Sequence, residues 1–292
     1  SARKVAPGEM APAIALLESR GLVPVQPEGL YAAAHQFAGP DAHRRALLQS
    51  ALDDPFIDAL WFARGGYGTA RVLDGLDWSA FLQRPKWLVG FSDLTALHSA
   101  AVSQGHMSLH APLAISAAGA AAPECLAKTW DIAMGGLFPD YTFDPGPEAV
   151  AGRARGPLVG GNLSVLHSCL GTAGQLFPEG AILFLEDLDE YLYHIDRMLV
   201  HLARVGLFSR LAGIAVGSFT DLKDNAIPFG ERVEEMVLRL AGPLGIPIAF
   251  QAPAGHLREN WPLVLGAPTE LVVARGQARL RQQPQVPADW VI

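Results

Sequence analysis

Three residues that could do chemistry together each follow an apolar stretch of the sequence. Ser92 follows "WLVGF", Glu186 follows "AILFL", and His256 lies in "QAPAGHLREN", the segment after "GIPIAF". Ligands of open α/β sheets bind beyond the carboxyl ends of the strands, so polar side chains at these points are expected to gather. A hydroxyl, an imidazole and a carboxylate are the parts of a serine hydrolase, and that chemistry is the first hypothesis.

Ser92 allows two interpretations. Serine between a strand and a helix is a common N-cap, and the local sequence alone favours that role. The alternative is a strained elbow that exposes the hydroxyl at a helix N-terminus, where backbone N–H groups could stabilise an oxyanion. Gly90 fits the elbow, but Leu94 stands where the G-x-S-x-G pattern has its second glycine. The incomplete pattern leaves both interpretations open.

The base and the acid of such a site have to be chosen among several candidates. There are nine histidines, and His98 is excluded because six helical residues place it about 9 Å from Ser92 along the axis, on another face. His256 lies in a loop at a strand end, where catalytic side chains are usually presented, and a solvent-exposed loop histidine is the equal alternative. Glu186 marks the carboxyl end of its strand, while a helix-start acid is its structural alternative.

The glycine-rich segment "ARGGYGTARVL" could serve an oxyanion. Gly66 and Gly68 form G-x-G without the third glycine of a dinucleotide-binding loop. Such a turn can instead offer bare backbone N–H groups to a negative charge, and a simple tight turn is the alternative. No zinc pattern occurs, since H-E-x-x-H is absent and His256 with Glu259 is too little.

Apolar strands that alternate with helices position these residues and predict an α/β fold with a parallel sheet. We expect an N-terminal domain over residues 1–138, a linker over 139–155 that is rich in Pro, Gly and charge, and a second domain over 156–292. A short strand is expected after Gly21, and "TELVVARGQARLRQQ" is expected to form a hairpin that turns at Arg275 and Gly276.

Composition excludes several classes of protein. Half of the 292 residues are hydrophobic and 17% are charged, which supports a large core rather than disorder. The net charge of −7 argues against a nucleic-acid-binding surface. No apolar run is long enough to span a bilayer, and "SARKVAPGEM" lacks the apolar segment of a signal peptide. Cys125 and Cys169 form no disulfide framework or zinc pattern and fit a reducing cytosol.

Five segments in order resemble the LD-carboxypeptidase family of serine peptidases across nearly the whole chain. They are "ARGGYGTARVLDGLDW", "PKWLVGFSDLTALH", "GGNLSVL", "LFLEDLDEYLYHIDRML" and "PAGHLRENWPLVLG". The resemblance implies a Rossmann-like N-terminal domain with a parallel sheet and a smaller α/β C-terminal domain, with the active site at their interface. Family chains usually begin with a strand ahead of the segment matched by "SARKVAPGEM", and no such strand precedes it in this sequence.

The resemblance also implies roles for particular residues. Ser92 matches the nucleophile, His256 the general base and Glu186 the orienting acid, and the backbone N–H groups of Gly66 and Asp93 match the oxyanion hole. It further implies a cytoplasmic homodimer, without cofactor, that removes the terminal D-alanine from murein tetrapeptides during cell-wall recycling.

The substrate contacts and the exact function stay open at this point. Arg64, Tyr67 and Arg258 are candidate substrate-binding residues, with solvated surface arginines as the alternative. One rival function is a relative with the same triad that inactivates peptide–nucleotide antibiotics as a self-immunity peptidase. The other is a non-catalytic module that binds wall peptides and uses Ser92 only as a helix cap.

Overall fold

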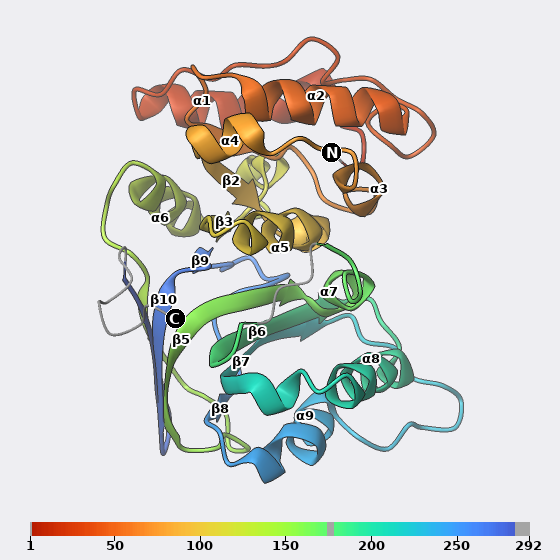
Figure 1. The fold of residues 1–292 in the computed structure, drawn as a ribbon, viewed down its shortest axis with the longest axis vertical. Helices are drawn as coiled ribbons and strands as arrows, with labels where there is room; N and C mark the ends of the chain where they lie inside the picture. The colour runs from red at the N-terminus through yellow and green to blue at the C-terminus, as the bar shows by residue number, and fades with distance from the viewer. Residues whose placement is uncertain (1, 174–177, 284–292) are drawn as a thin grey trace.

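The computed structural model describes residues 2–173 and 178–283, which fold into two α/β parts stacked one above the other (Figure 1). The upper part contains a four-stranded sheet in the order β1-β2-β3-β9. Its first three strands are parallel, and the last runs antiparallel. The strands are β1 (Ala59–Trp61), β2 (Trp87–Gly90), β3 (Ser108–His110) and β9 (Leu263–Leu265). The helices around this sheet are α1 (Ala11–Ser19), α2 (Asp41–Asp53), α3 (Ala70–Leu73), α4 (Ser79–Gln83), α5 (Thr95–Ser103) and α6 (Pro123–Ala133), with 3-10 turns at Pro7–Met10, Ser92–Leu94 and Ala114–Ala118.

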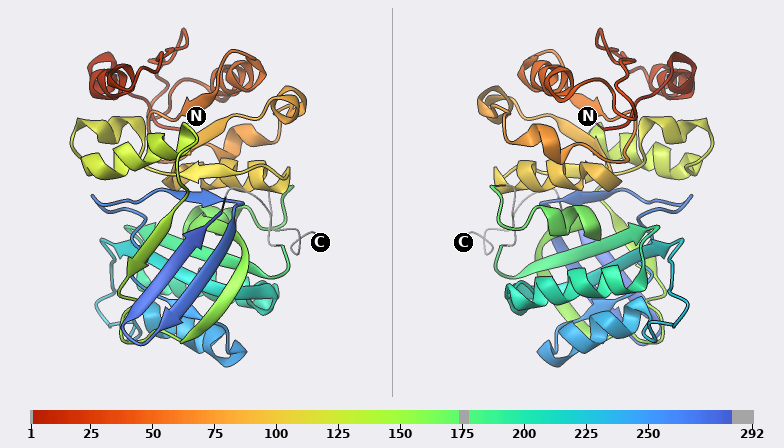
Figure 2. Two further views of the ribbon diagram at one scale, coloured as in Figure 1. Left: turned by 90° about the vertical axis from the view of Figure 1, so that its left-hand side faces the viewer. Right: turned by 90° about the vertical axis from the view of Figure 1, so that its right-hand side faces the viewer.

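The lower part contains a mixed seven-stranded sheet in the order β4-β11-β10-β5-β6-β7-β8. Strands β5 to β8 are parallel, while β4, β11, β10 and β5 form an antiparallel group that lies side by side in the left view of Figure 2. The strands are β4 (Asp140–Phe143), β5 (Gly152–Asn162), β6 (Ala181–Leu188), β7 (Leu211–Thr220), β8 (Ile248–Ala249), β10 (Pro268–Ala274) and β11 (Gln277–Gln282). The helices are α7 (Leu163–Ser168), α8 (Leu192–Arg204) and α9 (Val233–Ala241), with 3-10 turns at Phe208–Arg210 and Gly242–Leu244.

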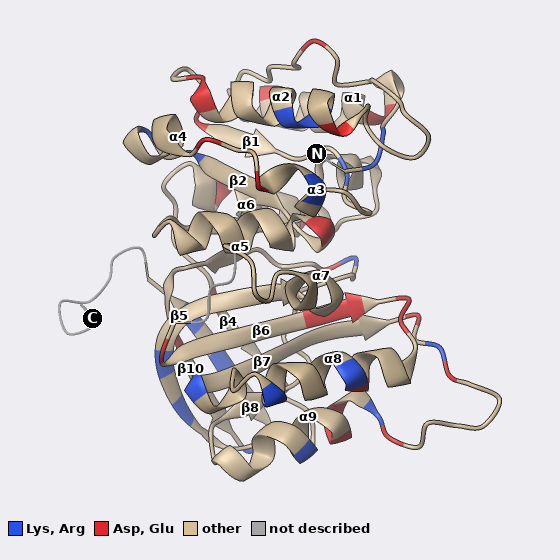
Figure 3. Cartoon of the chain, turned by 45° about the vertical axis from the view of Figure 1, so that its right-hand side comes forward, with Lys and Arg blue, Asp and Glu red and all other residues tan. Residues whose placement is uncertain are grey.

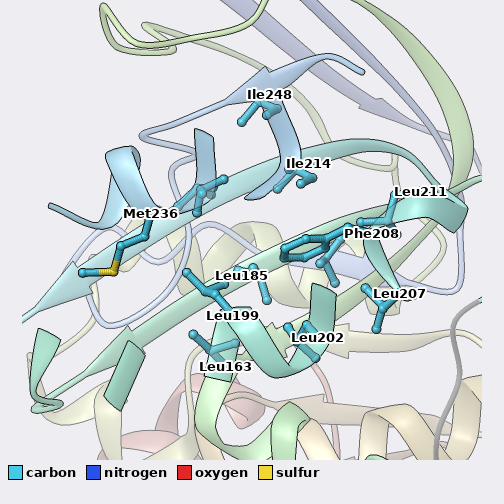
Figure 4. Packing of buried hydrophobic residues seen from close by; sticks show 14 of the residues in the cluster. Leu163, Leu185, Leu199, Leu202, Leu207, Phe208, Leu211, Ile214, Met236 and Ile248 are labelled. Atoms are coloured by element: carbon cyan, nitrogen blue, oxygen red, sulfur yellow. The ribbon is translucent and has the colours of Figure 1, made fainter. Parts of the chain in front are cut away.

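The largest core of the lower part lies between the parallel strands and helices α8 and α9 (Figure 4). On α8, Ile195, Leu199 and Leu202 recur at helical spacing and are fully buried. They pack with Leu185 of β6 and Ile214 of β7. Each such side chain stabilises the fold by about 1.5–3 kcal/mol through its removal from water, so this core fixes β6 against α8.

The prediction of two α/β domains is confirmed, and three details of the chain's organisation are now visible. The segment 139–155, expected as a linker, contains β4 and the start of β5. Strand β9 comes from the second expected domain and pairs with β3 of the first sheet. The boundary at 139–155 therefore stays a prediction, because the second expected domain contributes β9 to the sheet of the first.

One predicted strand is wrong and the predicted hairpin is confirmed. No strand follows Gly21, and Val23 and Val25 are 86% and 65% exposed without a neighbouring strand to pair with. Strands β10 and β11 form the hairpin, with Ala274 opposite Gln277. Arg275 and Gly276 form its turn, where Gly276 has a φ of +74° that favours glycine. Within the described residues, no helix is both long and apolar enough to cross a membrane.

Candidate active site

Ser92 lies at a sharp turn between β2 and α5. Phe91 is extended, and Ser92 has a φ of +64°, in the left-handed region. A residue other than glycine in that region costs about 1–3 kcal/mol, which the surrounding packing must offset. The Ser92 hydroxyl caps neither the 3-10 turn that it begins nor α5. The helix-cap interpretation is therefore wrong, and the backbone has the strained form of an elbow.

The glycine loop at residues 64–68 lies against this elbow. A Cβ added to Gly65 would stand 3.4 Å from Ser92 Cβ and 3.5 Å from Ser92 Oγ. Gly66 has a φ of +105°, a conformation that L side chains rarely adopt. In the described part of the chain, the backbone N–H groups of Gly66 and Asp93 donate to no loop carbonyl or side chain. Both N–H groups are thus available to an acceptor beside the Ser92 hydroxyl.

The carboxylate of Asp93 holds the end of the same loop. One oxygen accepts the backbone N–H of Thr69 at 2.8 Å, and the other accepts that of Gly68 at 3.3 Å. From the opposite side, the buried Arg44 donates through Nη1 to the Gly68 carbonyl at 2.7 Å. Sequence reasoning assigned only the backbone of Asp93 to the site. Its side chain links the loop directly to the residue after Ser92.

Glu186 and His256 come together from the lower part of the molecule. His256 Nδ1 and Glu186 Oε2 lie 2.6 Å apart, with the histidine side chain 15% exposed and the glutamate fully buried. Gly255 has a φ of +119°, and a Cβ there would come 2.9 Å from Glu186 Cβ. The Asn260 side chain accepts the Gly255 N–H at 2.9 Å. The loop can therefore press His256 onto Glu186 because residue 255 has no side chain.

Phe91 connects the Ser92 elbow in the upper part of the molecule with the Glu186–His256 pair in the lower part. Its ring centroid lies 4.7 Å from that of His256, so the histidine sits directly against the residue that precedes Ser92. Phe91 also contacts the buried His110, with ring centroids 5.6 Å apart in an edge-to-face arrangement. His110 in turn contacts Phe184 of β6, with ring centroids 5.1 Å apart. This chain of rings brings the three residues predicted from the strand ends into one region.

His98 lies in the core and takes no part in this region. It is completely buried, and its Nε2 lies 2.8 Å from the Gly90 carbonyl. Burial lowers the pKa of His98 from 6.5 to about 4, so the ring is neutral near pH 7. Burial likewise lowers the pKa of His110 well below its usual value. Several other histidines have partners outside this region, namely His43 with the Gly29 carbonyl, His194 with Glu190, and His167 with His201.

Asp187 and Asn162 form a second polar network, of which sequence reasoning missed Asn162. Asp187 accepts hydrogen bonds from Asn162 Nδ2 at 2.8 Å and from the Ser164 N–H at 2.9 Å. The acidic end of β6 beside α7 is visible in Figure 3. The Asn162 N–H donates to Thr95 Oγ1 at 3.0 Å and so ties β5 to the start of α5. Asn162 ends β5 in register with Glu186, so the strand-end rule could have found it.

The three residues predicted to bind substrate have different surroundings. Arg64 lies 3.8 Å from Glu9, and both side chains are partly exposed. Tyr67 is 55% exposed and its ring lies 6.3 Å from that of Phe37. Arg258 is exposed, and its carbonyl accepts the Ala122 N–H. Over residues 2–173 and 178–283, no group of three His, Cys, Asp or Glu side chains could hold a metal ion.

Two family matches cover most of the chain. Residues 1–111 match the LD-carboxypeptidase N-terminal domain, and residues 155–271 match the LD-carboxypeptidase C-terminal domain. The chain belongs to the LD-carboxypeptidase family, a family of serine peptidases. The resemblance carried by the five sequence segments is thereby confirmed.

Particular relatives place the chain within this family. A putative carboxypeptidase from Streptomyces coelicolor is 38% identical over 253 residues, which cover 83% of this chain and 78% of that protein. A murein tetrapeptide carboxypeptidase from Pseudomonas aeruginosa is 34% identical over 238 residues, which cover 77% of this chain and 76% of that protein.

Solved structures share the fold. The crystal structure of a muramoyltetrapeptide carboxypeptidase from Oxalobacter formigenes matches with a TM-score of 0.88 at 26% identity and covers 98% of this chain and 97% of that one. MccF in complex with glutamyl sulfamoyl guanosine matches with a TM-score of 0.81 at 19% identity and covers 95% and 92%. The second likeness concerns the fold alone.

Proposed function

We propose that the protein is a serine carboxypeptidase that hydrolyses the L,D peptide bond before the terminal D-alanine of murein tetrapeptides. The observation that carries the proposal is the buried contact of Glu186 with His256, set against the strained elbow at Ser92. The names of relatives at 33% and 34% identity, a probable murein peptide carboxypeptidase and a murein tetrapeptide carboxypeptidase, support this substrate class.

Glu186 sets the protonation pattern of His256 in the proposed mechanism. Its carboxylate accepts a hydrogen bond from the Nδ1–H group, so the proton stays on Nδ1 and Nε2 carries the lone pair that can take the Ser92 proton. The Ser92 oxygen then attacks the scissile carbonyl carbon. The N–H groups of Gly66 and Asp93 stabilise the resulting oxyanion, and one such donor contributes about 3–4 kcal/mol to transition-state binding.

Two proton transfers by His256 complete the proposed reaction. The imidazolium gives its Nε2 proton to the nitrogen of the leaving D-alanine as the C–N bond breaks, which leaves an ester on Ser92. His256 next removes a proton from water as the water oxygen attacks the ester carbonyl. The Ser92 oxygen leaves and regains the proton, so the shortened peptide is released and the enzyme is restored.

Release of D-alanine from a murein tetrapeptide tests the proposal. We expect the wild type to release D-alanine and Ser92→Ala to lose at least about 10⁴-fold in kcat. Ser103→Ala is the matched control, because Ser103 lies at the far end of α5 and its hydroxyl donates to the Ala100 carbonyl. If Ser92→Ala hydrolysed the peptide as fast as Ser103→Ala, Ser92 would not be the nucleophile.

Both rival functions have weaker support than the murein peptidase. The likeness to MccF lies below 25% identity and carries the fold only, so a peptide–nucleotide antibiotic is the second substrate to test. A non-catalytic binding module would not need a strained Ser92 or a buried Glu186 bonded to His256. A protein that bound the tetrapeptide without releasing D-alanine would be such a module.

We also propose that the enzyme works in the cytoplasm as a homodimer, as the family resemblance implies. The free thiols of Cys125 and Cys169 are buried, which fits a reducing compartment. Burial raises the pKa of Cys125 to about 12, which keeps this thiol protonated and unreactive. Light scattering behind a sizing column would give the mass in solution, and a single mass near 31.1 kDa would contradict the dimer.

A further inference from the structure

A carboxypeptidase must recognise a free carboxylate, and the mechanism above assigns no residue to that task. The terminal carboxylate lies one residue beyond the scissile carbonyl, about 4 Å along the substrate chain. A cation that serves it must therefore stand beside the groups that hold the oxyanion. Sequence reasoning suggested Arg64 and Arg258, but Arg64 lies near Glu9 and neither has a described contact with the elbow.

Arg3 stands at the required place. A Cβ added to Gly66 would lie 2.2 Å from Arg3 Cδ and 2.4 Å from Arg3 Cγ, so the aliphatic part of Arg3 crosses directly over Gly66. Gly66 is the residue whose N–H is proposed to hold the oxyanion. The guanidinium continues from Cδ, so its charge lies within a few bond lengths of the Gly66 backbone.

The backbone around Arg3 fixes this placement. The Arg3 N–H donates to the Gly65 carbonyl at 3.2 Å, and Arg3 forms an isolated antiparallel bridge with Phe37. On either side, Ala2 accepts a hydrogen bond from Ala38, and Lys4 donates one to Gln36. The segment 2–4 is thus attached both to the glycine loop and to residues 36–38. These backbone hydrogen bonds hold Arg3 in a fixed position relative to the glycine loop.

The charge of Arg3 is not neutralised by an ion pair with any acidic residue that the structure describes. Its side chain is exposed, and over residues 2–173 and 178–283 no acidic group forms an ion pair with it. Arg64, on the neighbouring loop, lies 3.8 Å from Glu9. An arginine without an acidic partner, held against Gly66, whose N–H donates to no described group, makes that region positive and suited to an anion.

We propose that Arg3 binds the terminal carboxylate of the substrate and so makes the site specific for the last residue of a peptide. This inference rests on the proposed function. The planar guanidinium offers two parallel N–H groups to a carboxylate, a geometry that lysine lacks. The substrate then spans from Ser92, through the oxyanion hole at Gly66, to Arg3.

The test compares a murein tetrapeptide that ends in D-alanine with the same peptide ending in D-alaninamide, which lacks the charge. Arg3→Met keeps an aliphatic chain over Gly66 and removes the guanidinium. We expect it to lower kcat/KM for the free acid by about 10- to 100-fold, mainly through KM, the range for hydrogen bonds to a charged group. For the amide we expect wild type and Arg3→Met to differ by less than about twofold, and Arg3→Lys to recover part of the preference for the acid.

Two further variants sharpen the comparison. Lys4→Met is the matched control, because it removes the next cation of the same extended segment, whose side chain is expected to leave on the opposite side. It should keep the wild-type ratio of acid to amide. Arg64→Met tests the competing arginine. If Arg64→Met, and not Arg3→Met, removed the preference for the acid, the assignment to Arg3 would be wrong.

Failure of this inference differs from failure of the proposed function. If the wild type cleaves the acid faster than the amide and Arg3→Met keeps that ratio, only the role of Arg3 falls. If the wild type releases neither D-alanine from the acid nor D-alaninamide from the amide, the proposed function falls and the inference falls with it. Activity of Arg3→Met on the amide shows that the variant is folded, so a lost preference for the acid is not a folding defect.

Discussion

The elbow and glycine loop around Ser92 are shaped by backbone conformation, whereas Glu186 and His256 are placed by a buried contact between side chains. The first region uses a serine at a φ of +64° and a glycine at +105°. The second uses a fully buried carboxylate 2.6 Å from an imidazole nitrogen. A substitution at Ser92 can therefore remove backbone strain without changing any charge. In the Glu186–His256 region, a substitution that removes the charge of Glu186 also removes the group that orients His256.

The largest expected effect comes from Ser92→Gly, which removes the hydroxyl and the strain together. We expect at least about 10⁴-fold loss of kcat, as for Ser92→Ala. The two inactive variants should differ in stability, because glycine adopts a positive φ freely and alanine does not. Ser92→Gly should exceed Ser92→Ala by about 1 kcal/mol in the free energy of unfolding, measured in urea.

Ser103 provides the matched control for this pair, since it lies in the regular helix α5. There the order should reverse, and Ser103→Gly should be less stable than Ser103→Ala by at most about 1 kcal/mol, because Ser103 ends the helix. The same order at both positions would mean that the elbow stores no strain.

Glu186→Gln tests the second region and should have the next largest effect. Glutamine keeps the size of the side chain, but its amide can donate to Nδ1 and so favour the wrong tautomer of His256. We expect kcat to fall by about 10³- to 10⁴-fold, as when the acid of a catalytic triad becomes an amide. The rate of D-alanine release at saturating substrate measures this.

A second glutamate–histidine pair serves as the control. Glu190 Oε2 lies 2.8 Å from His194 Nδ1, but Glu190 precedes α8, His194 lies in its first turn, and both side chains are partly exposed. Glu190→Gln should leave kcat within about twofold, because exposed pairs contribute little. Equal rates in Glu186→Gln and Glu190→Gln would reduce the buried pair to a packing contact.

The pH dependence of stability should differ between the buried Asp187, which follows Glu186 in β6, and the more exposed Asp140. Burial raises the pKa of Asp187 from 3.8 to about 6. Because the folded state holds this proton more tightly, the stability that it contributes below pH 3.8 is lost as the pH rises through about 6. The loss amounts to about 3 kcal/mol at 1.36 kcal/mol for each pKa unit.

Denaturant titrations between pH 4 and 7.5 check this loss. The free energy of unfolding of the wild type should fall relative to Asp187→Asn as the pH rises. The contribution of Asp140 to stability should change with pH in the opposite direction, because the hydrogen bond that it accepts from Arg279 lowers the pKa of its carboxyl group. The stability contributed by Asp140 is present above its ordinary pKa of 3.8 and is lost as the pH falls below it. Parallel curves for wild type and Asp187→Asn would contradict the burial effect.

The two regions also differ in how far the sequence predicts them. Glu186 could be identified because it is the first polar residue after the apolar run of β6, and the family resemblance supplied His256 as its partner. The conformation of Ser92 could not, because a cap and an elbow have the same local pattern and only the φ of +64° separates them. The parallel sheet follows from the alternation of strands and helices. Strand β9 does not, because it pairs with β3 across more than 150 residues of chain.

Contacts made by distant segments explain the other omissions. Arg3 reaches Gly66, and Asp93 reaches Thr69, through folding that brings separate loops together. No pattern of apolar spacing marks either residue. Asn162 is the exception, since it ends β5 in register with Glu186, two residues before the end of β6, and the strand-end rule applies to it.

The smallest expected effect belongs to Asp93→Asn, which loosens the glycine loop without removing a proposed donor. The two carboxylate oxygens accept the N–H groups of Gly68 and Thr69. Asparagine has one oxygen, so its NH₂ group would face one of these N–H groups. The loop should shift slightly, and we expect kcat to fall about 10-fold with KM unchanged, less than the loss of a whole oxyanion donor.

Asp77→Asn is the control for this change, because the Asp77 carboxylate accepts the Ser79 N–H at 2.9 Å in an exposed turn. It alters the same kind of bond outside the site and should leave kcat within about twofold, as surface substitutions usually do. If Asp93→Asn raised KM and left kcat unchanged, Asp93 would contact the substrate rather than position the loop. Equal kcat values for Asp93→Asn and Asp77→Asn would mean that the loop at residues 64–68 keeps its shape without Asp93, and that backbone conformation alone is enough to form the Ser92 half of the site.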